Sequence, residues 1–446
     1  MLGVLAHTPA ALAAPDAPAP APAPAQATAG RCTTGVQSAL QEIACALAIG
    51  AHDLRQALVV SAAVSASEPL ERGAELAARL TRSVAGSLGA RVGTSPSDLS
   101  RARQLAKAHG TLVYLSPTLR DGKLSVTLDV YAAPSSFWDR VRQPSLASLH
   151  HAYAERRVDA EIRSFSPRVP LVAGRPKVFD LGEPEVLALA CGDTGADGSL
   201  ELVVVGRHRV MAGRLRQGRF VPGKLRQWQE LAQVAPAPLR QPLGSAAIRS
   251  DGSLDVGSTD RDTALRLDGD LQVQRELGRR LPWPGGGCAE MAAVSLESNP
   301  APCVADGPSP RAGGVSGVHA DAIAGARIVG QDGSVRSVRA VRDSERATVV
   351  LFDDAGRRVE LGGAGAQIAL GDLDLDGQPE VVVSHDTLAP SEDALRVFTW
   401  TAAGKLEERF RLPVPRGIRA LAVCPPEDGG AGSIALATGQ SLWWIR

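Results

Sequence analysis

Apolar residues recur at helical spacing in the first third of the chain. One face of the first expected helix carries Leu40, Ile43, Ala44 and Leu47. The pair Asp121 and Gly122 stands between two strand-like runs, which indicates a β-hairpin. The pattern predicts a small α/β domain over residues 31–168, with helices at Gln37–Ile49, Ala74–Leu88, Asp98–His109 and Ser145–Ser164 and strands at Ala57–Val64, Thr111–Leu115 and Leu124–Tyr131.

From Arg175 onward the pattern changes to short apolar strands separated by turns. Asp-Gly pairs mark these turns at a spacing of about 46 residues, if one degenerate copy lies around Glu297–Pro302. Propeller blades repeat at roughly 40–50 residues. We therefore expect an α+β two-domain chain whose second part, residues 170–446, is an all-β propeller with six blades, and with seven as the alternative. The pairs begin at Asp197, Asp251, Asp332, Asp376 and Asp428.

The last repeat, Ile418–Arg446, shows three strands where a blade holds four. The strand-like segment Lys177–Leu181, just before the first blade, can supply the fourth strand. Pairing the two ends of the ring removes exposed strand edges. The outer hairpins of other blades are expected at residues 264–277, 349–361 and 395–410.

The segment Ile368–Ser384 contains alternating aspartates in the order D-L-D-L-D-G. Carboxylates at positions 1, 3 and 5 and the carbonyl at position 7 can converge on one Ca²⁺ ion. An EF-hand begins in the same way but has Glu at position 12 between helices, whereas position 12 here is Val383 in a β-branched run. The loop therefore joins two strands, and its expected ligands are Asp372, Asp374, Asp376, Gln378 and Glu380.

The same pattern occurs once earlier, between residues 190 and 205. Asp193, Asp197 and Glu201 align without a gap on the first, third and last acidic residues of the later loop. Gly195 replaces the middle aspartate. Since one carboxylate is missing, we expect this copy to bind Ca²⁺ weakly or not at all.

These motifs resemble the FG-GAP/VCBS repeats of calcium-loop β-propellers, which include the integrin α-subunit head. The family pattern D-x-D-x-D-G-x-x-D matches at Asp372, Asp374, Asp376 and Gly377, and Glu380 replaces the final aspartate. The resemblance implies a Ca²⁺ ion that makes a hairpin rigid, and a propeller face that binds a protein or a glycan.

The first part resembles the amino-terminal α/β domain of the TolB family, whose members continue into a six-bladed propeller. The resemblance rests on the segment His109–Tyr131 and on the order of elements. It implies an architecture, with a structural cell-envelope component as an alternative function.

Composition narrows the classes of partner. The formal net charge is zero, which gives no support for nucleic-acid binding, and aromatic residues make up 4%, which gives none for a sugar-stacking platform. Residues 1–14 resemble a secretory signal, residues 15–30 form an Ala/Pro linker, and no apolar stretch is long enough to span a membrane. We therefore expect an exported protein.

Six cysteines without C-x-x-C spacing fit an exported chain with disulfides. Cys191 and Cys424 hold matching places in the first and last blades and are expected to bond across the seam. Local pairs are expected between Cys32 and Cys45 and between Cys288 and Cys303. Other pairings stay open from sequence alone.

The sequence gives little support for a catalytic site. The string Asp193–Asp197 matches an aspartic-protease motif, but the internal repeat explains it. The segment Gly218–Lys224 departs from the phosphate-loop template at Leu225, and the pair His150 and His151 falls on the last expected helix. His208 and His385 each follow a Val-rich strand and can reach a shared rim. The sequence thus favours a non-enzymatic binding or scaffold protein, with a hydrolase that uses the propeller as a scaffold as an alternative.

Overall fold

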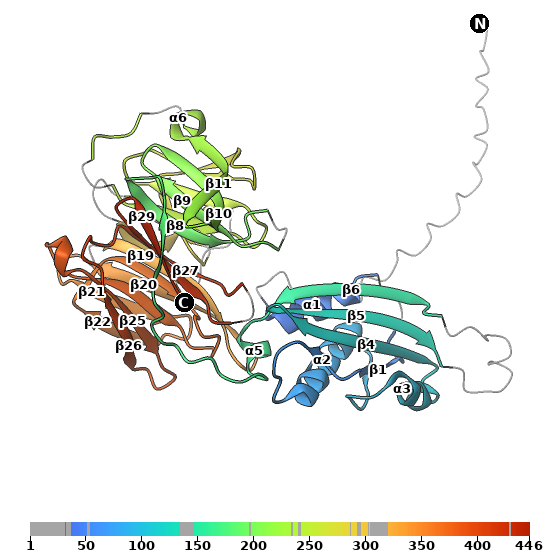
Figure 1. Cartoon of the computed structure of the whole chain (residues 1–446). Helices are drawn as coiled ribbons and strands as arrows, with labels where there is room; N and C mark the ends of the chain where they lie inside the picture. The colour runs from blue at the N-terminus through green and yellow to red at the C-terminus, as the bar shows by residue number, and fades with distance from the viewer. Residues whose placement is uncertain are drawn as a thin grey trace, which may run out of the picture.

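The computed structural model describes residues 32, 37–50, 54–133, 147–195, 198–232, 235–239, 242–285, 287–291, 296–301, 303, 320–427 and 430–446. The signal-like segment, the Ala/Pro linker, Asp197 and Asp428 lie outside these residues. Figure 1 shows two parts, a sheet with helices near the N-terminus and a larger all-β body that contains the C-terminus.

The first part is a mixed sheet in the order β3-β1-β4-β5-β6, with β2 also paired to β4. Parallel pairing joins β1 to β3 and β4, while β4, β5 and β6 pair antiparallel. The strands are β1 (Leu58–Ser61), β2 (Ser65–Ala66), β3 (Arg91–Val92), β4 (Thr111–Arg120), β5 (Lys123–Ala132) and β6 (His150–Arg157).

Helices cover both faces of this sheet because successive residues of β1 and β4 point to opposite sides. α1 (Ala39–Ala48) and α2 (Gly73–Leu88) bury their apolar stripes against one face. α3 (Leu99–Ala106), capped by Asp98, packs on the other face against Val60 and Leu112. The prediction of an α/β domain with these three helices and the central hairpin is confirmed.

The fourth predicted helix, Ser145–Ser164, is wrong. Residues His150–Arg157 form the edge strand β6, and only Ala160–Arg163 form a helical turn, α5. The Ala, Glu and Arg content favours a helix locally, but pairing with β5 over eight residues prevails. The two histidines therefore lie on a strand.

The second part comprises six blades in the described residues, each a short antiparallel sheet. Two single residue pairs, Arg219 with Asp180 and Leu296 with Ala320, join neighbouring blades into larger sheets. Blade 1 has β8 (Val186–Gly192), β9 (Glu201–Gly206), β10 (Arg209–Arg216) and β11 (Arg219–Gln227); blade 2 has β12 (Gly244–Ile248), β13 (Leu254–Ser258), β14 (Ala264–Leu267) and β15 (Val273–Gly278); blade 3 has β16 (Arg280–Trp283), β17 (Gly287–Met291) and β18 (Leu296–Ala301).

The later blades follow the same order of strands. Two short helices, α6 (Trp228–Leu231) and η1 (Pro390–Glu392), lie between strands of the ring. Blade 4 has β19 (Ala320–Val329), β20 (Val335–Asp343), β21 (Thr348–Asp353) and β22 (Arg358–Gly362); blade 5 has β23 (Ala364–Gly371), β24 (Glu380–His385), β25 (Ala394–Trp400) and β26 (Leu406–Pro413); blade 6 has β27 (Ala420–Cys424), β28 (Ser433–Thr438), β29 (Ser441–Ile445) and β7 (Lys177–Asp180).

Ring closure follows the prediction. β7 pairs antiparallel with β29, with Val178 opposite Trp443 and Phe179 opposite Leu442. A strand that precedes the first blade thus completes the last one, and the ring ends are held by backbone hydrogen bonds. The predicted outer hairpins β14–β15, β21–β22 and β25–β26 are also present.

The three predicted disulfides are formed. Cys191 and Cys424 bond across the seam between blades 1 and 6, at a sequence separation of 233 residues. Cys32 bonds to Cys45, and Cys288 bonds to Cys303. The described cysteines include no free thiol.

One repeat lies elsewhere than predicted. The first hairpin of blade 3 turns after Trp283, at Pro284 and Gly285, and the predicted copy at Glu297–Pro302 falls mainly on β18. The pattern misses this turn because it contains no Asp-Gly pair. Gly285 has a φ of 95°, so glycine supplies the turn geometry without the aspartate.

The turns between the first two strands of several blades contact the α/β domain. A guanidinium nitrogen of Arg157 donates to the carbonyl oxygen of Gly198 at 2.5 Å, and Arg79 donates to that of Asp332 at 2.5 Å. The Arg79 side chain also pairs with buried Glu161 at 2.8 Å. One end of the propeller therefore carries the α/β domain (Figure 1).

Candidate metal centre and channel mouth

The predicted calcium loop joins β23 to β24, the first two strands of blade 5. Strand pairing ends at Gly371 opposite Glu380, which leaves the residues between them free to form a tight loop. Leu375 and Gly377 have φ values of 55° and 82°, so the chain turns through the left-handed region twice. These turns direct the aspartates inward.

Backbone N–H groups hold the carboxylates in place. Asp372 accepts from Asp376 at 3.0 Å and from Gly377 at 2.9 Å, using a different oxygen for each. Asp374 accepts from Asp376 at 3.3 Å, and Asp376 accepts from Gln378 at 2.7 Å. Because an ionised carboxylate has about four lone-pair sites, these bonds leave acceptor capacity for a cation.

The three aspartates fit a calcium ion. One carboxylate oxygen from each of Asp372, Asp374 and Asp376 lies within 4.8 Å of the others. Oxygens that bind one Ca²⁺ at about 2.3–2.6 Å lie at most roughly 5 Å apart, so the three can share an ion without rearrangement of the loop. A hard, multivalent cation with oxygen ligands matches this donor set.

The electrostatics of the loop favour a cation. Burial raises the pKa of Asp372 to about 8, and repulsion from Asp376 and Asp374 adds to the rise. Burial and the neighbouring Asp376 also raise the pKa of Asp374. Negative charge is therefore costly at these positions unless a positive charge compensates it.

Glu380 lies outside the group of three converging oxygens. It is fully buried, and its two oxygens accept from the N–H of Leu373 at 2.7 Å and from the hydroxyl of Thr399 at 3.0 Å. Burial, with Asp374 as the next cause, raises the pKa of Glu380 well above its ordinary value. This carboxyl ties the loop to β25, and its expected role as a metal ligand stays a prediction.

Gln378 follows the loop at the position where a backbone carbonyl is expected to bind the ion. Its N–H is already directed at Asp376. Arg336 of β20 donates to the carbonyl oxygen of Gly377 at 2.6 Å, and burial lowers the pKa of this arginine. The neighbouring blade thus braces the loop from outside.

The first loop keeps part of this geometry. Asp193 accepts from the N–H of Gly198 at 2.6 Å, as Asp372 accepts from Gly377. Glu201 accepts from the Thr194 hydroxyl. Its third acidic residue, Asp197, lies outside the described residues, and Gly195 carries no carboxylate. The loop retains the hydrogen bond from Gly198 to Asp193, and its weaker metal site stays a prediction.

The calcium loop also lies at the boundary between the two parts of the chain. The side chain of Leu375, at the tip of the loop, packs against the apolar core of the α/β domain. Gly198 of the first loop and Asp332 of blade 4 accept hydrogen bonds from the same domain. The loop thus takes part in the contact between the propeller and the α/β domain.

A second feature, which the sequence indicated only through His385, lies at the other end of the innermost strands. The innermost strands of the blades line a central channel, whose described wall is mostly aliphatic. At this end the channel opens into a cavity of about 680 Å³. His385, Asp321 and Arg342 line this cavity, whereas His208 pairs with the lining residue Glu185 at 3.7 Å. Sequence spacing does not identify Asp321 and Arg342, because they come from blade 4 and carry no motif.

Comparisons with known proteins identify no family. No family model and no curated protein matches the chain, so the FG-GAP/VCBS and TolB resemblances stay predictions. Among solved structures, virginiamycin B lyase from Staphylococcus aureus is 11% identical over 61% of this chain and 98% of its own, with a TM-score of 0.35. A putative gluconolactonase is 13% identical over 63% and 93%, with a TM-score of 0.37.

A third similar structure is AofleA from Arthrobotrys oligospora, which is 10% identical over 61% of this chain and 85% of its own, with a TM-score of 0.38. Likenesses at these identities and scores say nothing about a ligand or a reaction. The assignment of function therefore depends on the residues of this chain.

Proposed function

We propose that this chain is an exported, non-enzymatic binding or scaffold protein whose propeller is stabilised by Ca²⁺ and presents one face to a protein or glycan ligand. The observation that carries the proposal is the convergence of Asp372, Asp374 and Asp376 within 4.8 Å in a loop braced by its own backbone. The ion would neutralise these carboxylates and make the β23–β24 hairpin rigid.

The three disulfides agree with an oxidising compartment outside the cytoplasm. None of the helices in the described part of the chain combines the length and apolar character that spanning a membrane requires.

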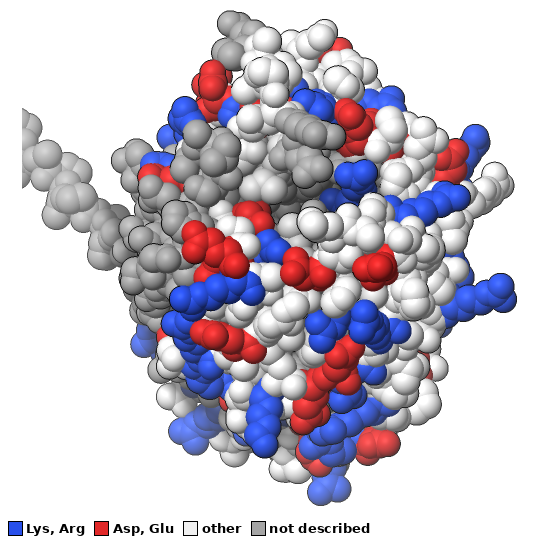
Figure 2. Space-filling view, turned by 90° about the vertical axis from the view of Figure 1, so that its left-hand side faces the viewer, with Lys and Arg blue, Asp and Glu red and all other residues white. Residues whose placement is uncertain are grey.

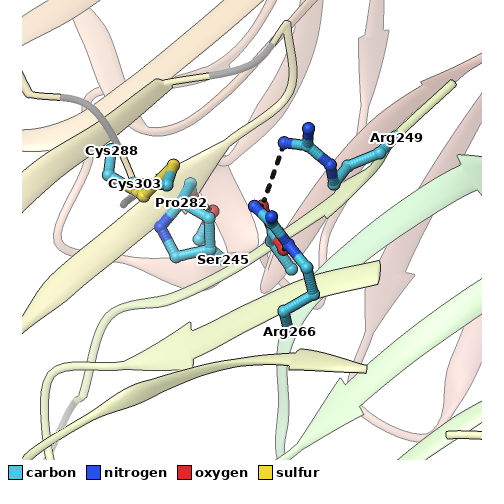
Figure 3. Close-up of a disulfide and its surroundings, with 7 residues drawn as sticks. Ser245, Arg249, Arg266, Pro282, Cys288 and Cys303 are labelled. Atoms are coloured by element: carbon cyan, nitrogen blue, oxygen red, sulfur yellow. Dashed lines mark hydrogen bonds and ion pairs between the residues drawn. A yellow bond between two sulfur atoms is a disulfide. The ribbon is translucent and has the colours of Figure 1, made fainter. Parts of the chain in front are cut away.

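The channel wall supports a binding role over a catalytic one. Ser245 is the hydroxyl residue of the described channel wall, and it donates to the backbone carbonyl of Pro282. Figure 3 shows these two residues beside the disulfide of Cys288 and Cys303. Cys191, also in the wall, is bonded to Cys424. The hydroxyl and the sulfur are thus committed to structural bonds, which leaves no nucleophile activated by a base among the described residues of the wall.

Thermal unfolding tests the proposal. The full chain is compared in EDTA and in millimolar Ca²⁺, beside an Asp374→Ala variant. A ligand at about 100 times its Kd stabilises by roughly 2.7 kcal/mol, which raises Tm by about 5–10 °C for a domain of this size. We expect this shift in the wild type and its loss in the variant. Equal Tm values in both buffers would show that the loop binds no calcium and would overturn the calcium-stabilised propeller.

A further inference from the structure

The cavity of about 680 Å³ lies at the end of the propeller away from the α/β domain. Its wall includes residues at the start of innermost strands, such as Val186, Gly244 and Gly365, whereas the α/β domain contacts turns at the opposite ends of such strands. The eight residues of β23 separate the cavity from the calcium loop by about 23 Å. The cavity is therefore a second, separate feature, of a size typical of small-molecule sites.

A fixed ion-pair network forms one side of the cavity. Arg342, with 8% of its side chain exposed, donates to Asp321 at 2.5 Å, to Asp386 at 3.2 Å and to the carbonyl oxygen of Ala364 at 2.8 Å. Three bonds in different directions hold this guanidinium in one position. The wall is thus preorganised and does not have to be ordered by a ligand.

Two buried polar atoms in this wall have no hydrogen-bond partner. They are the second oxygen of Asp321 and Nδ1 of His385. Burial raises the pKa of Asp321 despite its bond to Arg342. Leaving such groups unpaired costs free energy, so a ligand hydroxyl that reaches them after a small side-chain rotation would be stabilised.

The described lining holds four arginines and four acidic residues, which differ in how far they are already bonded. Asp393 is buried and accepts from the backbone N–H groups of His385, Ala394 and Ile418, so it is not available to balance a cation. Arg416 and Arg419 line the cavity and are exposed, and their guanidinium groups have no hydrogen bond or ion pair to a described residue. Two free guanidinium groups beside a polar wall favour a carboxylate.

The side of the propeller away from the α/β domain carries intermixed acidic and basic side chains and no broad patch of one sign (Figure 2). Long-range attraction of a polyanion is therefore not the basis of recognition. Selectivity must come from the local arrangement of groups in the cavity.

Phe, Tyr and Trp are missing from the described lining of the cavity. A neutral sugar that binds by stacking on a ring finds no platform there. A ligand with many hydroxyls and one carboxylate, in contrast, matches the unpartnered atoms and the two arginines. The amide of Gln367, which lines both the cavity and the channel, can donate to and accept from such hydroxyls.

We infer that this cavity binds an acidic saccharide, with the uronate carboxylate on Arg416 and Arg419 and ring hydroxyls on Asp321, His385 and Gln367. The inference rests on the proposed function as a binding protein, because it names the face and the ligand class. It does not depend on the calcium loop at the far end of the propeller.

Isothermal titration calorimetry of the full chain in Ca²⁺ buffer tests the inference. The probes are a glucuronate-containing hyaluronan tetrasaccharide and a trigalacturonate, with chitotetraose as the neutral comparator. We expect binding of at least one acidic probe, weaker binding at high salt, and weak or no binding of chitotetraose. Arg416→Ala/Arg419→Ala should weaken binding by at least about tenfold, and Gln367→Leu should weaken it to a smaller extent.

Arg411→Ala is the matched control, because Arg411 is an exposed arginine on the outer strand β26 and does not line the cavity. It should bind the acidic probe like the wild type. Unchanged Tm values verify that each variant is folded. Equal affinity for acidic and neutral probes, or wild-type binding by the double arginine variant, would overturn the inference.

No binding of either acidic probe would also overturn the inference, while a calcium-dependent Tm shift in the same protein would leave the proposed function standing. A protein that binds the acidic saccharide but shows no calcium-dependent Tm shift would contradict the calcium-stabilised propeller and leave the inference about the cavity standing. The two failures are therefore distinguishable.

Discussion

The N–H of Gly377 donates to Asp372 at 2.9 Å, and the N–H of Gly198 donates to Asp193 at 2.6 Å in the corresponding loop of blade 1. The same hydrogen bond thus closes both loops, although among the described residues three aspartates converge only in the blade 5 loop. Local turn geometry and metal-ligand chemistry are separable in this protein. The hydrogen bond survives in blade 1, where Gly195 stands in place of the middle aspartate.

Calcium dependence should therefore come from blade 5 alone. We expect Asp372→Asn to abolish the rise in Tm between EDTA and Ca²⁺, because the amide removes a charge from the ligand set. Asp193→Asn is the matched control, since it changes the equivalent aspartate of the other loop. Differential scanning calorimetry measures both. If the rise in Tm with Ca²⁺ were lost in Asp193→Asn but kept in Asp372→Asn, the calcium site would lie in the blade 1 loop, which would contradict the prediction.

Stability without calcium should fall as pH rises. Burial and the carboxylates of Asp376 and Asp374 raise the pKa of Asp372 to about 8 in the folded, metal-free chain, against 3.8 ordinarily. The folded state then binds a proton that the unfolded state releases, so stability is lost between about pH 4 and 8 as the pH increases. The pKa values of Glu380 and Asp374 shift in the same direction, and Arg336 and Arg409 are cations near the loop.

Thermal unfolding in EDTA across this pH range measures the effect. Calcium neutralises the ionised carboxylates, so the calcium-induced rise in Tm should grow with pH, because the ion competes with protons. Asp372→Asn should flatten the EDTA profile. A wild-type Tm in EDTA that increased steadily from pH 5 to 8 would contradict the argument.

The blades and the loop were predictable because their signals are local. Alternating aspartates and Asp-Gly turns stand next to the strands that they join, so spacing alone locates the β23–β24 loop. The same locality explains the error at His150–Arg157, where a helix-forming composition becomes a strand because β5 lies beside it. The pairing partner of an edge strand is not written in its own residues.

The channel mouth was not predictable for a related reason. Asp321 and Arg342 lie on the paired strands β19 and β20 of blade 4, and Asp386 follows β24 of blade 5. Strand pairing and the packing of neighbouring blades bring the three together. None belongs to a motif. The seam disulfide is an exception, because Cys191 and Cys424 occupy matching places in two repeats, and the repeat itself reveals their proximity.

The seam disulfide should stabilise the ring more than the local ones do. It closes a segment of 233 residues, whereas Cys288 and Cys303 are separated by 15. In the chain-entropy account, a longer closed loop restricts the unfolded state more, and disulfides contribute on the order of 2–5 kcal/mol. We expect Cys191→Ser/Cys424→Ser to lower the free energy of unfolding more than Cys288→Ser/Cys303→Ser in denaturant titrations. The opposite order would show that the β7–β29 pairing alone closes the ring.

Blade 2 contains a buried ion pair, and the loss of stability on mutation depends on which partner is changed. Asp255 has 2% of its side chain exposed and accepts from Arg266 at 2.7 and 2.9 Å, while Arg249 lies 3.6 Å away. Figure 3 shows the guanidinium groups of Arg249, which follows β12, and Arg266 of β14 close to one another. The carboxylate is thus compensated mainly by Arg266, which also packs in a largely enclosed position.

Arg266→Met should destabilise the fold by about 3–5 kcal/mol, because it leaves a buried carboxylate without its main partner. Asp255→Leu/Arg266→Met should recover most of that loss, since the charge is removed together with its partner. Urea unfolding of the two variants and of Asp255→Leu completes a double-mutant cycle. If the double variant were less stable than Arg266→Met, the ion pair would contribute through packing geometry rather than through charge compensation, because restoring neutrality would then bring no gain.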